Sequence, residues 1–285
     1  MVPAEPHHNA TGSGGFAASA PVVMGILNIT PDSFSDGGEF SGVEAAVDHA
    51  MQMLDEGAGI IDIGGESTRP DSDPVSPEEE IERVVPVIRA ILAERPETTI
   101  SVDTYHAATA EAALDAGARI INDISALRAD ERMAEVVSRA GCPLVLMHML
   151  GEPKTMQRDP RYDDVVGEVR QFLSERAEAA VSAGVDPENI ILDPGIGFGK
   201  TTQHNLALIE SLDAIAGLGY PVLFGASRKR FIGGISGIEE ASERVFGTVA
   251  TSVIAYERGA TIFRVHDVRA NREALEVAAA VSNAS

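Results

Sequence analysis

Short apolar runs recur along the chain, and longer amphipathic stretches separate them. The runs are rich in Val and Ile and stop at turn residues, a pattern that is typical of buried strands. They cover residues 22–30, 60–65, 99–104, 120–125, 143–148, 190–194, 221–227 and 261–266. Between or after them, apolar residues recur at helical spacing in residues 43–56, 77–94, 107–115, 130–140, 164–183, 204–215, 241–257 and 268–281. The pattern predicts strands and helices in strict alternation.

An alternating order of strands and helices indicates a parallel sheet whose strands are joined by helical crossovers. Eight such rounds in 285 residues favour an α/β fold, a closed (β/α)8 TIM barrel, over an open doubly wound sheet. Barrels of this length are commonly single domains, so we assign residues 20–285 to one barrel. Residues 1–19 are rich in small residues, and we predict that they form a disordered tail.

Polar side chains stand at the carboxyl ends of most of the predicted strands, where barrel enzymes build their sites. In chain order they are Asn28, Asp62, Asp103, Asn122, Asp123, His148, Asp193, Arg264 and His266. Arg264 and His266 are two residues apart and therefore point to the same side of their strand. Phe263 and Val265 should face the helices. Each polar residue alone would suit a structural hydrogen bond, but their convergence on one face favours a ligand site.

Residues 190–200 read IILDPGIGFGK, an apolar run that ends in Asp193 before a glycine-rich turn. A phosphate-binding Walker loop requires glycine where this chain has Pro194, and the alternating glycines do not follow the dinucleotide spacing. We therefore interpret the stretch as a strand that presents Asp193, with an apolar lip at Phe198. Taken alone, it is equally compatible with Asp193 as the N-cap of a helix.

The chain is strongly acidic, with 44 Asp and Glu against 22 Lys and Arg and a formal net charge of −22. This charge repels nucleic acids and anionic membranes, so we expect neither as a partner. No uncharged apolar run reaches membrane-spanning length and the first residues lack a secretion signal, so we expect a cytoplasmic protein. A surface of this kind also suits concentrated salt, and a salt-loving source is a hypothesis.

Lysine is rare, and every lysine follows a predicted strand: Lys154, Lys200 and Lys229. Positive charge on the functional face predicts a ligand with an anionic part. The candidates that would grip it are Lys229, Arg228 or Arg230, Arg264 and His266. The ligand should also have a flat part, because carboxylates and an amide can match the N–H edge of a heterocycle. The residues of this second group are Asp103, Asn122 and Asp193.

A metal-dependent hydrolase is an alternative for a barrel that offers His148, His266 and several aspartates. Such barrels usually place a histidine pair on the first strand, where this chain has Asn28 between two apolar residues. We therefore do not expect a metal held permanently by the protein. A Mg²⁺ that arrives with a pyrophosphate needs only one or two protein oxygens. Asn28 and Asp32 are the candidates.

Residues 28–38 (NITPDSFSDGG) and 62–70 (DIGGESTRP) resemble the two mobile loops of the dihydropteroate synthase family of pterin-binding TIM barrels. The resemblance continues through SVDT at 101–104, INDI at 121–124, MHM at 147–149, TMQ at 155–157, LDPGIGFGK at 192–200, GASRK at 225–229 and RVHDV at 264–268. These motifs follow one another in the family's order over nearly all of the chain after the tail.

The resemblance implies a transferase of folate biosynthesis. It would condense 6-hydroxymethyl-7,8-dihydropterin pyrophosphate with p-aminobenzoate to give 7,8-dihydropteroate and pyrophosphate. It also implies Mg²⁺ as cofactor with Asn28 as its ligand, a homodimer, and competition by sulfonamides for the aminobenzoate site. The catalytic residues that it implies are Asp103, Asp193, Lys229, Arg264 and His266.

The same resemblance implies three neighbouring binding sites. The pterin site would comprise Asp103, Asn122, Met147, Asp193, Phe198 and Lys229. The pyrophosphate site would comprise Asn28, Thr68, Arg264 and His266. The p-aminobenzoate site would comprise Phe34, Thr68, Arg69, Pro70 and Ser227.

The chain departs from the family pattern at two positions. His106 stands where the family often has lysine, and Asp71 stands where glycine usually follows the proline, which would stiffen that loop or change its closure. Two alternatives share the pocket: a pterin-dependent methyltransferase, and a non-catalytic pterin-binding paralogue. The methyltransferase does not need the loop motifs and the paralogue would lose them, so the intact motifs at 28–38, 67–70 and 227–229 favour the synthase.

Overall fold

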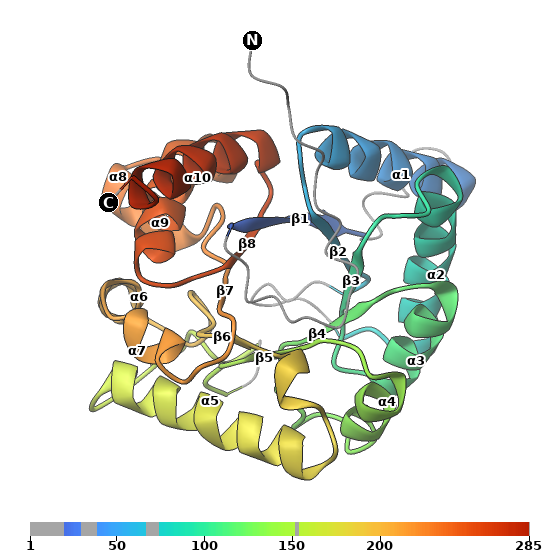
Figure 1. The fold of residues 1–285 in the computed structure, drawn as a ribbon, viewed down its shortest axis with the longest axis horizontal. Helices are drawn as coiled ribbons and strands as arrows, with labels where there is room; N and C mark the ends of the chain where they lie inside the picture. Colours follow the sequence, from blue (N-terminus) through green and yellow to red (C-terminus); the bar gives the residue numbers. More distant parts are fainter. Residues whose placement is uncertain (1–19, 30–38, 67–73, 152–153, 285) are drawn as a thin grey trace.

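The computed structural model describes residues 20–29, 39–66, 74–151 and 154–284. Parallel strands form a barrel, and helices surround it as an outer ring (Figure 1). The predicted (β/α)8 barrel is therefore confirmed. The predicted tail, residues 1–19, lies outside the described residues.

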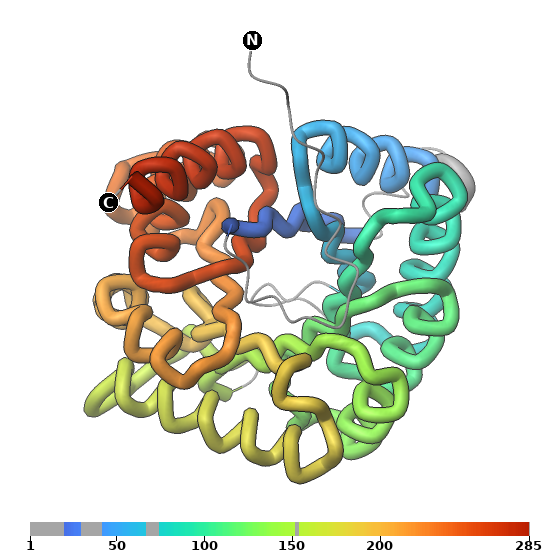
Figure 2. Tube along the Cα trace, in the orientation of Figure 1, coloured from blue at the N-terminus to red at the C-terminus, as the bar shows by residue number. Residues whose placement is uncertain are grey.

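The barrel has eight strands in the order β6-β5-β4-β3-β2-β1-β8-β7, and neighbouring strands are parallel. They are β1 (Val22–Asn28), β2 (Ile60–Gly64), β3 (Ile100–Asp103), β4 (Ile120–Asp123), β5 (Leu144–Met147), β6 (Ile190–Asp193), β7 (Leu223–Phe224) and β8 (Ile262–Val265). The first and last strands lie side by side, with Val22 opposite Ile262 (Figure 2). The two halves of the chain thus close into one ring.

The ring closes most weakly between β6 and β7, at a junction that we call the seam. In the described part of the chain, one bridge joins these strands, between Leu192 and Val222. The Leu192 N–H donates to the Pro221 carbonyl at 2.9 Å. The predicted strand 221–227 is reduced to two residues here, because the chain after Phe224 leaves the sheet for a turn.

Helices cover the outside of every strand (Figure 1). They are α1 (Glu39–Asp55), α2 (Pro77–Glu94), α3 (Ala107–Ala116), α4 (Met133–Ala140), α5 (Val165–Ser182), α6 (Thr202–Glu210), α7 (Asp213–Ala216), α8 (Arg230–Ser236), α9 (Val245–Glu257) and α10 (Val268–Ser282). Short 3-10 turns are η2 (Pro187–Asn189) and η3 (Ala241–Glu243).

The helices differ from the prediction in three places. The predicted helix 204–215 breaks at Ser211 into α6 and α7, and the predicted helix 241–257 opens with the 3-10 turn η3. Helix α8 was not predicted, because Gly233 and Gly234 interrupt its apolar pattern. Local capping sets other boundaries: Thr201 accepts from the His204 N–H at 3.2 Å and so begins α6 directly after the glycine-rich turn.

Two apolar layers form the core. Outward-facing strand residues pack against the helices in one large cluster, which contains Phe263 and Val265 as predicted. Inside the barrel lies a smaller layer made of Met24, Ile60, Ile120, Val145, Ile191, Leu223 and Ile262. Burial of these side chains supplies the main driving force for closure of the ring. Among the described residues, no helix is both long enough and apolar enough to cross a membrane.

Candidate active site

The polar residues of the barrel mouth stand two positions beyond the interior layer on their strands. Alternate side chains of a strand share a face, so an inward residue of the barrel interior is followed two positions later by an inward residue at the mouth, which is polar in every pair except the one that ends in Met147. The pairs are Ile60 and Asp62, Ser101 and Asp103, Ile120 and Asn122, Val145 and Met147, Ile191 and Asp193, and Ile262 and Arg264. The strand period thus brings the predicted site residues together on top of an apolar plug.

Arg264 holds two buried carboxylates at the centre of the mouth. Its Nε donates to Asp62 Oδ2 at 2.6 Å, and its Nη2 donates to Asp103 Oδ2 at 2.8 Å. The Asn122 amide also donates to Asp62 Oδ2, at 3.2 Å. Asp62 was noted at a strand end but assigned no role. It is fully buried, and it orients both Arg264 and Asn122. Its signal in the sequence was the same two-residue step from Ile60.

Burial and charge oppose each other at this centre. Burial raises the pKa of Asp103 to about 7, although the Arg264 guanidinium acts to lower it. Burial also acts against the charge of Arg264, but the carboxylates of Asp62 and Asp103 outweigh it and raise the pKa of Arg264 above its usual value. The guanidinium is therefore charged, and the two carboxylates that it holds form a wall of hydrogen-bond acceptors at the mouth.

A second charged pair, Asp193 and Lys229, spans the seam. Asp193 ends β6, and Lys229 precedes α8. Burial raises the pKa of Asp193 while Lys229 acts to lower it; burial lowers the pKa of Lys229 to about 7 while Asp193 acts to raise it. Asp193 Oδ1 accepts the Gly195 N–H at 2.7 Å. This N–H belongs to a turn, and Thr201 caps α6, so the helix N-cap interpretation of Asp193 is wrong.

Apolar side chains line the mouth beside these charges. Ile124, Met147, Met149 and Met156 form one buried cluster, and the Phe198 ring packs against it. The Phe198 ring thus contributes an apolar surface beside the charged residues. Lys229 lies over this ring, with its Nζ 4.3 Å from the ring centroid. The site offers polar edges and apolar faces at once, as a flat heterocycle requires.

Ser227 and His266 are bonded to each other across β7 and β8. Ser227 Oγ lies 2.9 Å from His266 Nδ1 and accepts the His266 backbone N–H at 3.1 Å. Arg228 does not join them: with φ 59° it turns away and forms a two-point ion pair with Asp267, at 2.6 and 2.9 Å. Arg228 was one of two arginines after the seventh strand that were considered for anion binding. Its guanidinium pairs with Asp267 instead.

Asn28 ends β1 with an exposed side chain. A Cβ atom on Gly64 would lie 3.7 Å from Asn28 Oδ1 and 3.9 Å from Asp103 Oδ2, so both oxygens border the same strand end. Four further residues of the predicted pyrophosphate and aminobenzoate sites lie outside the described residues: Phe34, Thr68, Arg69 and Pro70. The magnesium candidate Asp32 and the departure from the family pattern at Asp71 lie outside them too.

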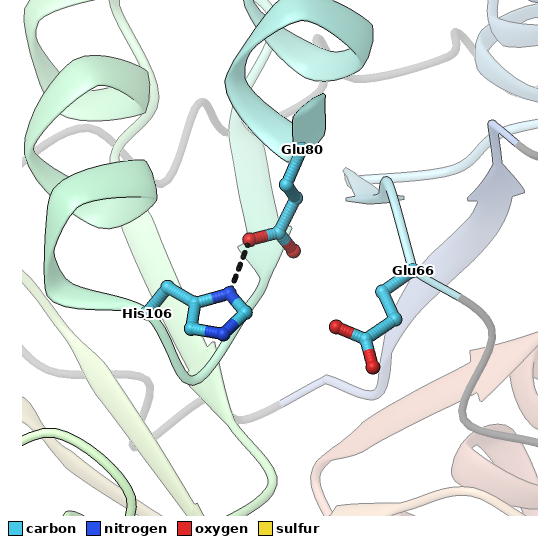
Figure 3. Close-up of side chains that lie close together, drawn as sticks. All are labelled: Glu66, Glu80 and His106. Carbon is cyan, nitrogen blue, oxygen red and sulfur yellow. Dashed lines mark hydrogen bonds and ion pairs between the residues drawn. The ribbon is translucent and has the colours of Figure 1, made fainter. Parts of the chain in front are cut away.

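A network of carboxylates and one imidazole supports the segment after β2 (Figure 3). Glu80 Oε2 lies 3.0 Å from His106 Nδ1 and accepts the Thr104 hydroxyl at 2.8 Å, while the Tyr105 hydroxyl donates to Glu66 at 2.7 Å. The hydrogen bond to Glu80 raises the pKa of His106, and burial raises the pKa of Glu66. His106, at the position where the family often has lysine, thus still offers Glu80 a cationic partner when protonated.

Comparisons with known proteins match the same region of the chain. The family described as pterin binding enzyme matches residues 24–266. A dihydropteroate synthase of Synechocystis is 49% identical over 259 residues, which are 91% of this chain and 89% of the relative. The chain belongs to the dihydropteroate synthase family.

Solved structures of the dihydropteroate synthase family share the fold. The Xanthomonas albilineans enzyme with 4-aminobenzoic acid has a TM-score of 0.86 at 49% identity, covering 92% of this chain and 93% of that one. The enzyme of the same organism in complex with 7,8-dihydropteroate has a TM-score of 0.83 at 47% identity, covering 92% of this chain and 94% of that one. These relatives favour a dihydropteroate synthase over the methyltransferase and the non-catalytic paralogue.

Proposed function

We propose that the protein condenses 6-hydroxymethyl-7,8-dihydropterin pyrophosphate with p-aminobenzoate to give 7,8-dihydropteroate and pyrophosphate. One observation carries the proposal: a buried wall of acceptors faces an apolar cluster, and cations stand at its borders. A pterin is flat, its edge carries N–H and amino donors, and its pyrophosphate carries negative charge. The shape and charge of the site suit all three properties.

The pterin edge is held by the buried carboxylates Asp103 and Asp193 with Asn122, because each can accept from ring N–H or amino groups. Met147 and Phe198 pack on the ring faces. Lys229 stands beside both Asp193 and Phe198, and so serves the acceptor atoms of the ring edge. Burial of Asp103, Asn122 and Asp193 makes their hydrogen bonds stronger than they are in water.

The pyrophosphate is bound by Arg264 and His266. Arg264 uses two of its nitrogens on Asp62 and Asp103, and a guanidinium carries five N–H donors, so donors remain for a phosphate oxygen. The Asp62 carboxylate, which makes no contact with the substrate in this proposal, fixes the guanidinium plane. Ser227 positions His266 through the 2.9 Å contact to Nδ1.

Asn28 supplies the protein oxygen for Mg²⁺. An amide oxygen is a hard donor of the kind that this ion prefers, and Mg²⁺ with several waters needs only one or two such oxygens. The exposed position of Asn28 beside Gly64, at the same strand end as Asp103, fits an ion that enters with the pyrophosphate. When bound, the ion would neutralise charge that builds up on the departing pyrophosphate.

The reaction then needs no strong base. The neutral arylamine nitrogen forms a C–N bond to the methylene carbon, the C–O bond breaks, and its electron pair leaves with pyrophosphate. The extra proton on nitrogen is released to water. Arg264 and His266 stabilise the leaving group, while Asp103 and Asp193 stabilise positive charge on the pterin ring.

Ser227 is the described residue of the proposed aminobenzoate site, and its bond to His266 joins this site to the pyrophosphate site. Competition by sulfonamides, a homodimer and a cytoplasmic location remain proposals that the family resemblance supports. The test is formation of dihydropteroate and pyrophosphate from both substrates with Mg²⁺, at low and at molar salt, with p-aminobenzoate omitted as control. Normal pterin binding without any product would contradict the proposal and favour the non-catalytic paralogue.

A further inference from the structure

Lys200 is a buried cation that the proposed mechanism does not use. It follows the glycine-rich turn, residues 195–199, and is only 3% exposed. Its Nζ donates to the carbonyl oxygens of Gly195 at 2.9 Å and Phe198 at 3.0 Å. The same Nζ lies 2.9 Å from Nδ1 of His148 and 3.4 Å from the His148 carbonyl oxygen. One ammonium therefore connects the turn after β6 to the residue that follows β5.

His148 is held as a neutral acceptor for this ammonium. Burial, and then the charge of Lys200, lower the pKa of His148 to about 3, so its imidazole is uncharged at neutral pH. Burial also lowers the pKa of Lys200, to about 7, while Asp193 acts to raise it and so favours the ammonium. Nδ1 then accepts from Lys200, and the ring proton resides on Nε2. The edge of the ring packs against Phe172, with centroids 4.8 Å apart, and the His148 backbone N–H donates to the Asp193 carbonyl at 3.0 Å.

The turn beside Lys200 is held by side chains at every carbonyl. The donors are Lys200 to Gly195 and Phe198, Lys229 to Ile196, Gln157 to Gly197, and the Tyr162 hydroxyl to Gly199. The three glycines have φ values of 66°, 84° and 61°, which exclude a regular helix or strand. Buried carbonyls without a ladder partner must find another donor. Lys200 provides two of these bonds.

We propose that Lys200 is a positioning residue for pterin binding: its ammonium fixes this turn so that Phe198 and Lys229 are preset for the substrate. This inference rests on the proposed function. The two lysines differ in one respect. Lys229 is partly exposed and lies over the Phe198 ring, so it can exchange the Ile196 carbonyl for a ligand. Lys200 is enclosed, and its Nζ contacts the Gly195 and Phe198 carbonyls and the His148 ring.

Removal of the Lys200 ammonium leaves the Phe198 carbonyl without its side-chain donor and the Gly195 carbonyl with only the Phe198 N–H at 3.1 Å, and the turn moves until these carbonyls find another donor. The Phe198 ring then leaves its place on the pterin face. We expect the affinity for pterin pyrophosphate to fall about tenfold, which is the scale of one charge-assisted hydrogen bond or an aromatic contact. The KM for p-aminobenzoate should change less than about twofold and kcat little, because Lys200 does not contact the reacting atoms.

The experiment compares Lys200→Met with Arg161→Met, which removes a cation from the surface of the preceding connection. Titration calorimetry gives the pterin affinity of each protein, and steady-state kinetics give both KM values and kcat. A selective loss of pterin affinity in Lys200→Met alone supports the proposal. In Lys200→Ala, added propylamine should restore part of the affinity, whereas propanol should not. Unchanged pterin affinity in folded Lys200→Met would overturn the proposal.

The design separates this inference from the proposed function. If the wild-type protein binds pterin but forms no product, the proposed function fails, while the calorimetric comparison still decides the role of Lys200. If the wild type is active and the Lys200 variants bind pterin normally, the positioning role alone fails. Should Lys200→Met not fold, Lys200→Gln carries the test, because its shorter neutral amide keeps a donor but removes the ammonium that holds both carbonyls. Normal pterin affinity in folded Lys200→Gln would then overturn the proposal.

Discussion

Two carboxylates at the barrel mouth destabilise the folded protein when they are ionised. Asp103 and Asp193 are buried, and burial raises the pKa of both. A carboxyl group whose folded pKa exceeds its unfolded value destabilises the fold once it ionises, that is, as pH rises above the unfolded pKa. The arrangement becomes favourable when a ligand supplies N–H donors. At these residues, ionisation therefore favours ligand binding but lowers the free energy of unfolding.

Replacement of Asp193 by asparagine tests this conflict. In Asp193→Asn, pterin affinity should fall on the order of 10- to 100-fold, because a charged acceptor is lost. The free energy of unfolding in urea at pH 7.5 should stay equal or rise, since the ionised carboxylate is removed. The matched control is Asp123→Asn, a buried carboxylate that caps the Ser125 and Leu127 N–H groups at 2.7 and 2.8 Å. Burial raises the pKa of Asp123 as well, so the control should match Asp193→Asn in stability but keep pterin affinity. Normal pterin binding by Asp193→Asn would contradict the site.

His106 forms a pH-dependent contact with Glu80, close to the residues that follow β2. Its pKa is raised, so the stability that it contributes is fully present below the unfolded pKa of about 6.5 and is lost as pH rises through the folded pKa. In His106→Gln, the loss of unfolding free energy should be larger at pH 5.5 than at pH 8.5. The difference should stay below about 1 kcal/mol for this partly exposed pair. His106→Lys should keep the contact at both pH values. An identical loss at both pH values in His106→Gln would show that the Glu80 pair contributes nothing.

Among the elements, strands were easier to predict than the segments that join them. The alternation of inward and outward side chains along each strand predicted which residues face the barrel interior, from Asp62 to Arg264. A single strand register places the apolar residues inside the barrel and the polar residues at its mouth. The turn at residues 195–199 and helix α8 were harder, since side chains from distant loops hold the first and glycines obscure the second. Asp62 had no assigned role because its partners, Asn122 and Arg264, are far away in sequence. Lys200 had none because His148 is 52 residues away and the nearby carbonyls that it contacts are presented only by the shape of the turn.

Gly195 is the point where the glycine-rich turn meets the β5 end. A Cβ atom there would lie 1.9 Å from the His148 carbonyl oxygen, at a φ of +66°. Gly219 has a φ of +87° but no atom within 4 Å of its Cβ position. We expect Gly219→Ala to cost about 1 kcal/mol of unfolding free energy from strain alone, and Gly195→Ala to cost at least ~3 kcal/mol. Urea unfolding measures both. Equal losses of unfolding free energy in the two variants would mean that the turn relaxes enough to avoid the clash with the His148 carbonyl.

The molecule as a whole carries a net charge of −22, which its local cations at the mouth do not offset. Composition alone determines this net charge, and the absence of polyanionic partners stays a prediction from it. We expect the thermal unfolding midpoint to rise between about 0.05 M and 1 M NaCl, because screening relieves self-repulsion over a distance of about 10 Å or less. Equimolar changes with a neutral osmolyte provide the control. A midpoint that falls with salt would remove the hypothesis of a salt-loving source.

The seam between β6 and β7 makes the ligand part of the architecture. In the described residues, one backbone bridge joins these strands, and the two sides carry Asp193 and Lys229. A pterin bound by both side chains would link the two sides of the seam, where backbone pairing between the strands is weakest. Amide hydrogen exchange near Leu192 and Val222 should therefore slow on ligand binding more than exchange between β1 and β2. Without a ligand, the barrel would open between β6 and β7, and bound substrate would hold these two strands together.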